Sequence, residues 1–225
     1  MRDIVTIFLK DVSIETSGGG IFPAVAAFAV VLASVLHFTD IFPSSPATVT
    51  QAAPAVFWIC ILFAATVGFE RSFEVERKSQ ALRSILMSPV DRGAVFIGKM
   101  LANLTLLVAV EAVFIPVFAL FFRLDAFSSA LPFLSVVFAA TVGIAAVGTL
   151  LSALSAQTDM KGVVFPVLLF PLLIPVLISA SLGVSAALGG GVEQDFARHI
   201  KVLVSFDLAF IAAGTLIYGY IIEEI

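Results

Sequence analysis

The sequence carries very little charge. Only 12% of its 225 residues are charged, whereas 60% are hydrophobic. A soluble domain holds roughly twice that share of charged residues, because its surface must face water. There is also just one cysteine, Cys60, so the chain cannot contain a disulfide framework. This composition predicts a protein that lies in a membrane, and it leaves no room for a soluble catalytic domain.

Long apolar stretches make up most of the chain. A helix needs about 20 apolar residues to cross the ~30 Å hydrocarbon core of a bilayer. Several stretches reach or approach this length, and short polar segments separate them. We therefore predict an all-α membrane protein, a single transmembrane domain over 1–225, with six membrane spans at 21–39, 52–69, 94–122, 131–156, 162–188 and 202–222.

Basic residues predict how the chain is oriented. If the N-terminus is in the cytoplasm, most lysines and arginines fall on the cytoplasmic side, and the outer segments hold only Arg123, Arg198 and Lys201. The loop 39–51 has no basic residue. Because basic residues accumulate in cytoplasmic loops, the N- and C-termini are both predicted to be cytoplasmic.

Residues 1–20 precede the first span and have an amphipathic pattern. One side of a helix over this stretch would carry apolar residues, namely Ile4, Ile7, Phe8, Val12 and Ile14. The other side would carry charged residues, namely Arg2, Asp3, Lys10 and Asp11. The pattern predicts a short helix in the cytoplasmic interface, and a frayed polar tail is the alternative. A second brief interfacial helix is predicted over 192–201.

Two spans have compositions that predict how they pack. Prolines recur in the fifth span, at Pro166, Pro171 and Pro175. Because a proline leaves a carbonyl without its helical partner, neighbouring helices must satisfy that carbonyl, and we expect this span to be bent and packed inside the bundle. Small residues in the fourth span permit close approach of backbones: Gly143, Ala145, Ala146, Gly148 and Ser152.

The stretch 93–100 has the Gly-x-x-x-x-Gly-Lys spacing of a nucleotide-binding loop. Met100 stands where such a loop needs a serine or threonine hydroxyl for Mg²⁺, and a membrane span follows at once. We therefore interpret the match as accidental. The chain is predicted to be no enzyme, with no catalytic site of its own.

A strongly charged segment, 70–92, separates the second span from the third. Its apolar positions Phe73, Leu82 and Ile85 have roughly helical spacing, and Ser88-Pro89 ends that helix. A short surface helix of this kind is suited to dock in a groove of a soluble partner. The alternative is a solvated connector that only fixes the topology.

Ionisable residues inside membrane spans are costly and usually functional. Glu111 lies in the third span, and Asp207 lies near the outer end of the sixth. Both are candidate intramembrane functional acids. The alternative is that each is protonated or packed against backbone donors. Trp58, near the outer end of the second span, is interpreted as an interface anchor.

Three stretches carry a family resemblance. The first is Ala53-Pro54-Ala55-Val56-Phe57-Trp58, followed by Glu70-Arg71-Ser72-Phe73. The second runs from Leu82 to Pro89 and continues to Gly98-Lys99. The third is Lys161-Gly162-Val163-Val164 with the prolines of 170–178. In this order and spacing, the chain resembles the haem exporter protein B family, the membrane subunit of the ABC-type complex of cytochrome c maturation.

The resemblance implies an ABC-2 exporter-like permease in the bacterial cytoplasmic (inner) membrane. It implies pairing with a second copy of the chain and with an ABC ATPase subunit, and association with a haem-handling membrane subunit and a periplasmic haem chaperone. Haem would be the cargo of the complex, and ATP and Mg²⁺ would bind the partner ATPase. The chain itself would bind no cofactor or metal, and nucleic acid is not an expected partner.

The resemblance also implies that the cytoplasmic helix between the second and third spans receives the stroke of the ATPase. The residues expected to make this contact are Glu70, Arg71, Phe73, Glu74, Arg77, Leu82 and Arg83. Residues 78–83 depart from the family pattern, since they are basic where the family is usually acidic and glycine-bearing. This departure fits a diverged member with a co-adapted ATPase.

Two histidines are nominal haem ligands, because neutral imidazole can ligate haem iron. His37 and His199 would both lie near the outer face, and His199 is the stronger candidate for a haem-proximal residue. Interface histidines with no ligand role are far commoner.

Two other functions stay open on the sequence. One is a permease of the same architecture for another cargo, such as a lipid, a glycan or a drug. The other is a secondary transporter that uses Glu111 and Asp207 for proton coupling.

Overall fold

The computed structural model describes residues 2–15, 21–39, 46–78, 90–122, 130–155, 164–190 and 193–223. These residues are helical almost throughout, and none of them forms a strand. The helices are α1 (Arg2–Ile14), α2 (Phe22–Phe38), α3 (Pro46–Lys78), α5 (Arg92–Phe122), α6 (Ala130–Ser155), α7 (Val164–Ser185), the short π-helix η2 (Ala186–Gly190) and α8 (Glu193–Glu223). The prediction of an all-helical membrane protein is confirmed.

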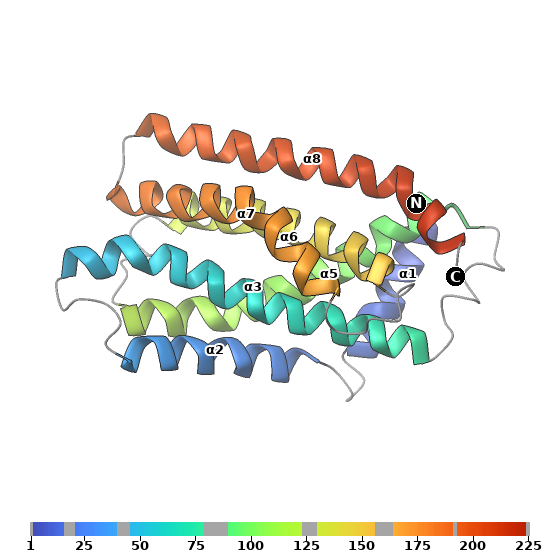
Figure 1. The fold of residues 1–225 in the computed structure, drawn as a ribbon, viewed down its shortest axis with the longest axis horizontal. Coiled ribbons are helices and arrows are strands. Elements are labelled where there is room, and N and C mark those ends of the chain that lie inside the picture. The colour runs from blue at the N-terminus through green and yellow to red at the C-terminus, as the bar shows by residue number, and fades with distance from the viewer. Residues whose placement is uncertain are drawn as a thin grey trace.

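The helices other than α1 and η2 lie side by side along the length of the molecule, and α1 lies at one end of this bundle (Figure 1). Five of the described helices contain stretches long and apolar enough to cross a membrane, namely Ala52–Arg71, Arg92–Phe122, Ala130–Ser155, Val164–Leu188 and Phe196–Ile221. The remaining helix of the bundle, α2, is apolar and has 17 residues. That length is at the lower end of the range for a membrane-spanning helix.

The end of the bundle that holds α1 is called the base below. It holds α1, the last part of α3 from Glu70, the start of α5 and the end of α8, which lie at the same end of the molecule in Figure 1. Glu15, just after α1, accepts a hydrogen bond from the backbone N–H of Phe22 at the start of α2. This carboxylate satisfies one of the free N–H groups of the helix start and opposes the positive end of the helix dipole.

Helix α6 is the central helix and packs against α3, α5, α7 and α8. Its small residues Gly143, Ala145, Ala146 and Gly148 are all buried. A Cβ atom at Gly148 would collide with the ring of Phe69 on α3. The close approach of these two backbones therefore depends on glycine, as the small residues of this span predict.

Helix α7 is less enclosed than its prolines led us to expect. It buries one face, formed by Phe165, Leu169, Leu173 and Val176, while Pro171 and Pro175 are exposed on the single chain. Residues four apart share a face of a helix, so these two prolines point outward together. The prediction that this span packs inside the bundle holds for one face only: α7 packs against α3, α6 and α8, whereas the face with the two prolines is open on the single chain.

The brief interfacial helix predicted over 192–201 does not exist as a separate element. Residues 193–201 form the first turns of α8, which runs without a break from Glu193 to Glu223. No proline occurs in this stretch, and its first glycine is Gly214. Phe196 and Ile200 also pack against the core, so the helix continues through the predicted boundary.

Trp58 is buried in the bundle, with only 1% of its surface exposed. Its ring meets the ring of Phe57 edge-on at 5.2 Å, and Phe57 in turn contacts Phe114, Phe118 and Phe133. The interpretation of Trp58 as an anchor at the membrane surface is wrong. The side chain faces an aromatic cluster that joins α3, α5 and α6, and this orientation is set by helix packing and not by local sequence.

Candidate coupling site at the base of the bundle

Helix α3 carries the start of the charged segment beyond the membrane. With 33 residues it is about 50 Å long at 1.5 Å per residue, which exceeds the ~30 Å core of a bilayer. Glu70 is half-buried where the apolar stretch ends, and Arg71 is exposed. No described residue makes a hydrogen bond to the buried atom Oε1 of Glu70. The helix thus brings the first two predicted coupling residues to the base.

The other predicted coupling residues are described less fully. Phe73, Glu74 and Arg77 lie on the last turns of α3, which ends at Lys78. Their side chains, and the whole of Leu82 and Arg83, lie outside the described residues. The charged segment therefore begins as a direct extension of a membrane helix, and the prediction of side-chain contacts within it stays a prediction.

The chain re-enters the bundle at Asp91. The Asp91 atom Oδ2 accepts a hydrogen bond of 2.9 Å from the backbone N–H of Ala94, which caps the start of α5. The next residue, Arg92, lies against Gly219 of α8, where an added Cβ atom would be 3.2 Å from the Cβ of Arg92. The first turn of α5 is therefore fixed both by its own cap and by α8.

Helix α8 makes a second close contact one turn further along α5. Gly214 lies against the ring of Phe96, so closely that a Cβ atom at this position would collide with the ring. The ring of Phe96 also lies 5.5 Å from the ring of Tyr218, and both side chains are fully buried. Two glycines of α8 thus allow the start of α5 to pack directly on the end of α8.

Helix α1 packs against the opposite side of this part of α5. A Cβ atom at Gly98 would lie 3.0 Å from the Cβ of Ile7 and 3.1 Å from the carbonyl oxygen of Ile4. Such distances are shorter than ordinary van der Waals contact, so a larger residue would push the helices apart. Ile7 is accordingly buried, although it belongs to a short helix at the end of the molecule.

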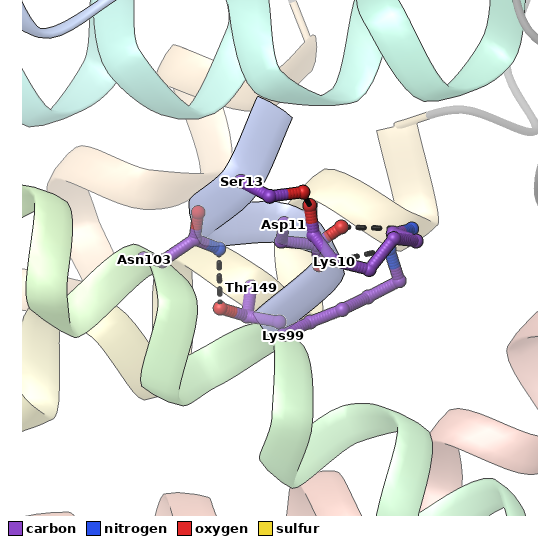
Figure 2. A network of polar contacts seen from close by, with 6 residues as sticks. All are labelled: Lys10, Asp11, Ser13, Lys99, Asn103 and Thr149. Carbon is purple, nitrogen blue, oxygen red and sulfur yellow. Dashed lines mark hydrogen bonds and ion pairs between the residues drawn. The ribbon is translucent and has the colours of Figure 1, made fainter. Parts of the chain in front are cut away.

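Polar contacts surround this junction (Figure 2). The ammonium of Lys99 lies 3.9 Å from Oδ2 of Asp11, and the other carboxylate oxygen of Asp11 lies 2.7 Å from the ammonium of Lys10. One turn further along α5, Asn103 donates a hydrogen bond of 2.9 Å to the hydroxyl of Thr149 on α6. The network joins α1, α5 and α6, and Lys99 is only 4% exposed.

Sequence reasoning missed the pairing of Lys99 with Asp11. The available signal was a lysine inside an otherwise apolar run, which needs a partner if it is buried. The same structure explains the accidental nucleotide-binding spacing of residues 93–100. These residues belong to α5, which starts at Arg92, so they form a helix and not a phosphate-binding loop.

The two intramembrane acids both contact α6. Glu111 is 4% exposed, and its atom Oε1 lies 2.6 Å from the hydroxyl of Thr141. Asp207 is 7% exposed and lies against Gly143, where an added Cβ atom would be 2.6 Å from Oδ1 of the acid. No described residue makes a hydrogen bond to that oxygen. Each acid occupies a helix contact, Glu111 between α5 and α6 and Asp207 between α8 and α6.

The two histidines lie on different helices and have mainly apolar neighbours. His37 of α2 stacks on Phe121 of α5, with ring centroids 5.4 Å apart. His199 of α8 is half-buried beside Gly183 of α7. Within the described ranges, no three residues of the types His, Cys, Asp and Glu gather in a way that could hold a metal ion. The assignment of His199 as a haem-proximal residue stays a prediction.

Comparison with known proteins supports the family resemblance. A curated relative from Paracoccus denitrificans (strain Pd 1222), named Heme exporter protein B, is 25% identical over 208 residues. This match covers 92% of the chain and 92% of that relative. The sequence profile of the family described as CcmB protein matches residues 2–223. Because the match spans nearly the whole helical bundle, the chain belongs to the CcmB protein family.

Proposed function

We propose that this chain is the membrane subunit of an ABC-type complex of cytochrome c maturation. It couples ATP hydrolysis by a partner subunit to haem export, or to the release of a haem-loaded periplasmic chaperone. The observation that carries the proposal is the family match over residues 2–223. The name of the curated relative, Heme exporter protein B, supports haem as the cargo and not as a resident cofactor.

The base of the bundle is the proposed docking end for the ATPase. Helix α3 extends past the membrane there with Glu70 and Arg71, and α5 starts there under the cap of Asp91. A displacement of the segment between these two helices reaches the bundle through both of them. Since α5 packs on α1, α6 and α8, such a displacement can alter the contacts of several helices at once.

The orientation and the partners follow from the same proposal. The base faces the cytoplasm of a bacterium, both termini are cytoplasmic, and the bundle spans the inner membrane. The full complex contains a second copy of the chain, a haem-handling membrane subunit and a periplasmic haem chaperone, in addition to the ATPase.

Co-purification from the native membrane in mild detergent tests this function. The unaltered chain is expected to bring an ABC ATPase and haem-handling membrane proteins with it. The double variant Glu70→Lys, Glu74→Lys is expected to insert normally but to lose the ATPase, because reversed charges face the docking groove. Ala81→Pro is expected to have the same effect by breaking the docking helix.

A matched control reverses charge at the other end of the bundle. Arg198 and Lys201 are exposed on the first turns of α8, so Arg198→Glu with Lys201→Glu changes as much charge and should keep the ATPase. Unchanged recovery of the ATPase with the variants at 70 and 74 would contradict the docking assignment. Recovery of an ATPase without haem-handling proteins would still support an ABC permease, but it would contradict haem as the cargo.

A further inference from the structure

Lys99 is an unusual residue for its position. It lies seven residues after the start of α5, in a helix that is apolar along most of its length, and its side chain is 5% exposed. A buried ammonium loses its hydration, and that cost is offset only when an opposite charge and further polar atoms surround it. Asp11, on a different helix, supplies an opposite charge 3.9 Å away. This pair ties the buried ammonium of Lys99 to α1.

The close packing of α1 on α5 beside this ion pair gives a second link between the two helices. Gly98 is adjacent to Lys99, and its missing side chain makes the space that Ile7 fills. An ion pair alone would tolerate a loose and variable contact, because long side chains can follow a moving partner. The packing of Ile7 on Gly98 does not, because even a Cβ atom added at Gly98 would come within 3.0 Å of α1. Together the two contacts fix α1 on α5 in position and register.

We propose that Asp11, Gly98 and Lys99 form a latch that makes α1 move with α5 as one rigid unit when the ATPase acts on the segment before α5. Lys99 is thus a positioning residue for coupling, acting through α1 and not by touching cargo or ATPase. This inference rests on the proposed function. Its basis is the place of the latch, two helical turns from the point where the coupling segment enters the bundle.

The latch gives α1 a role beyond anchoring. Without it, an amphipathic helix in the interface would stay with the lipid surface while α5 shifts. With it, the shift of α5 also moves α1, and Asn103 beside the latch passes the shift to Thr149 of α6. Coupling through packed helices and polar contacts of this kind needs a contiguous set of rigid neighbours, which this junction provides.

The test begins with single variants in the full complex. Lys99→Gln and Asp11→Asn are expected to keep the ATPase bound while the yield of mature c-type cytochrome and the permease-stimulated ATPase rate fall by about tenfold, a typical size for coupling between sites. The swapped pair Asp11→Lys, Lys99→Asp is expected to recover most of both signals. Full activity of Lys99→Gln, or no recovery in the swapped pair, would overturn the latch.

A disulfide between α1 and α5 tests whether the two helices stay together during the transport cycle or must separate. Cysteines at Ile7 and Gly98 are suited to the test, since Ile7→Cys removes the methyl that a side chain at 98 would meet at 3.0 Å. Their Cβ atoms, 3.0 Å apart here, need to separate by about half an ångström to reach the lower end of the disulfide range, ~3.5 Å. The pair is placed in a Cys60→Ala chain that also carries Lys99→Gln, and the purified complex is assayed before and after oxidation.

Oxidation is expected to restore the stimulated ATPase rate of the Lys99→Gln complex, and reduction is expected to abolish it again. The cysteine pair with Lys99 unchanged should be active when oxidised and less active when reduced, because a side chain at 98 without the disulfide pushes α1 away from α5. A disulfide that blocks activity would mean that α1 must leave α5 during the cycle, which overturns the proposal. If no ATPase accompanies even the unaltered chain, the proposed function fails instead, so the two failures are distinguishable.

Discussion

Thr141 illustrates how a buried acid is accommodated in this bundle. Its hydroxyl lies 2.6 Å from Glu111 Oε1 and 2.8 Å from the carbonyl oxygen of Val137. A hydroxyl has a single hydrogen, so it cannot donate fully to both oxygens. When it donates to Glu111 Oε1, the hydrogen bond joins the two helices directly. Glu111 is then a structural link between α5 and α6.

The corresponding variants have different expected effects. Glu111→Gln keeps a group that can bond to Thr141, and it should retain transport activity. Glu111→Leu or Thr141→Val leaves one buried polar group without its partner, and should lower the free energy of unfolding by about 1–3 kcal/mol. Thermal unfolding in detergent and the yield of mature c-type cytochrome measure the two effects. Loss of activity in Glu111→Gln at unchanged stability would revive a role in proton transfer.

At the scale of the helices, glycines determine which neighbours can approach α6 and α5. Gly148 accommodates Phe69 of α3, and Gly214 of α8 accommodates Phe96 of α5. In a membrane the lipid is as apolar as the side chains, so helices associate through close packing and not through burial from water. These positions therefore contribute more to the arrangement of the helices than their small size suggests.

Enlarging Gly148 should separate α6 from α3. Gly148→Val forces the ring of Phe69 out of its place, and we expect a loss of about 1–3 kcal/mol of stability from overpacking. The matched control is Ala209→Val on the exposed face of α8, which should be neutral. The melting temperatures of the two purified variants check this expectation. Equal melting temperatures would show that the Phe69 ring can move to another position without loss of stability.

At the scale of the whole molecule, the two helices that flank the charged segment reach different neighbours. Both helices pack against α2 and α6; in addition, α3 packs against α7, and α5 packs against α1 and α8. The segment between them is therefore placed to act on two sides of the bundle. This arrangement suits a subunit whose work is mechanical, and it agrees with the proposed docking of an ATPase at the base.

Cysteine labelling tests the orientation of the whole bundle. Thr6 is exposed on α1 at the base, and Thr39 is exposed at the opposite end of α2. In a Cys60→Ala chain, Thr39→Cys should react with a membrane-impermeant maleimide in intact spheroplasts. Thr6→Cys should react only after the membrane is opened, because the proposed orientation puts the base in the cytoplasm. The reverse pattern would contradict the predicted orientation and the docking end together.

Some features of the candidate site were predictable and others were not. Glu70 and Arg71 could be placed at a membrane boundary because the apolar run ends there, and hydropathy alone measures that. The burial of Trp58 and the pairing of Lys99 with Asp11 were not predictable. Both depend on which side of a helix faces a neighbour, and an apolar helix in lipid has no polar face that reveals its orientation.

The sequence by itself determined the all-helical membrane class of this protein and its family. Length and hydropathy decide whether a segment can remain in lipid, and this requirement acts on each segment separately. The tertiary structure alone decided the contacts: α6 at the centre, α1 fixed to α5 through Gly98 and Lys99, and both buried acids against α6. These contacts join residues far apart in the chain, and they follow from which glycines meet which side chains once the helices pack.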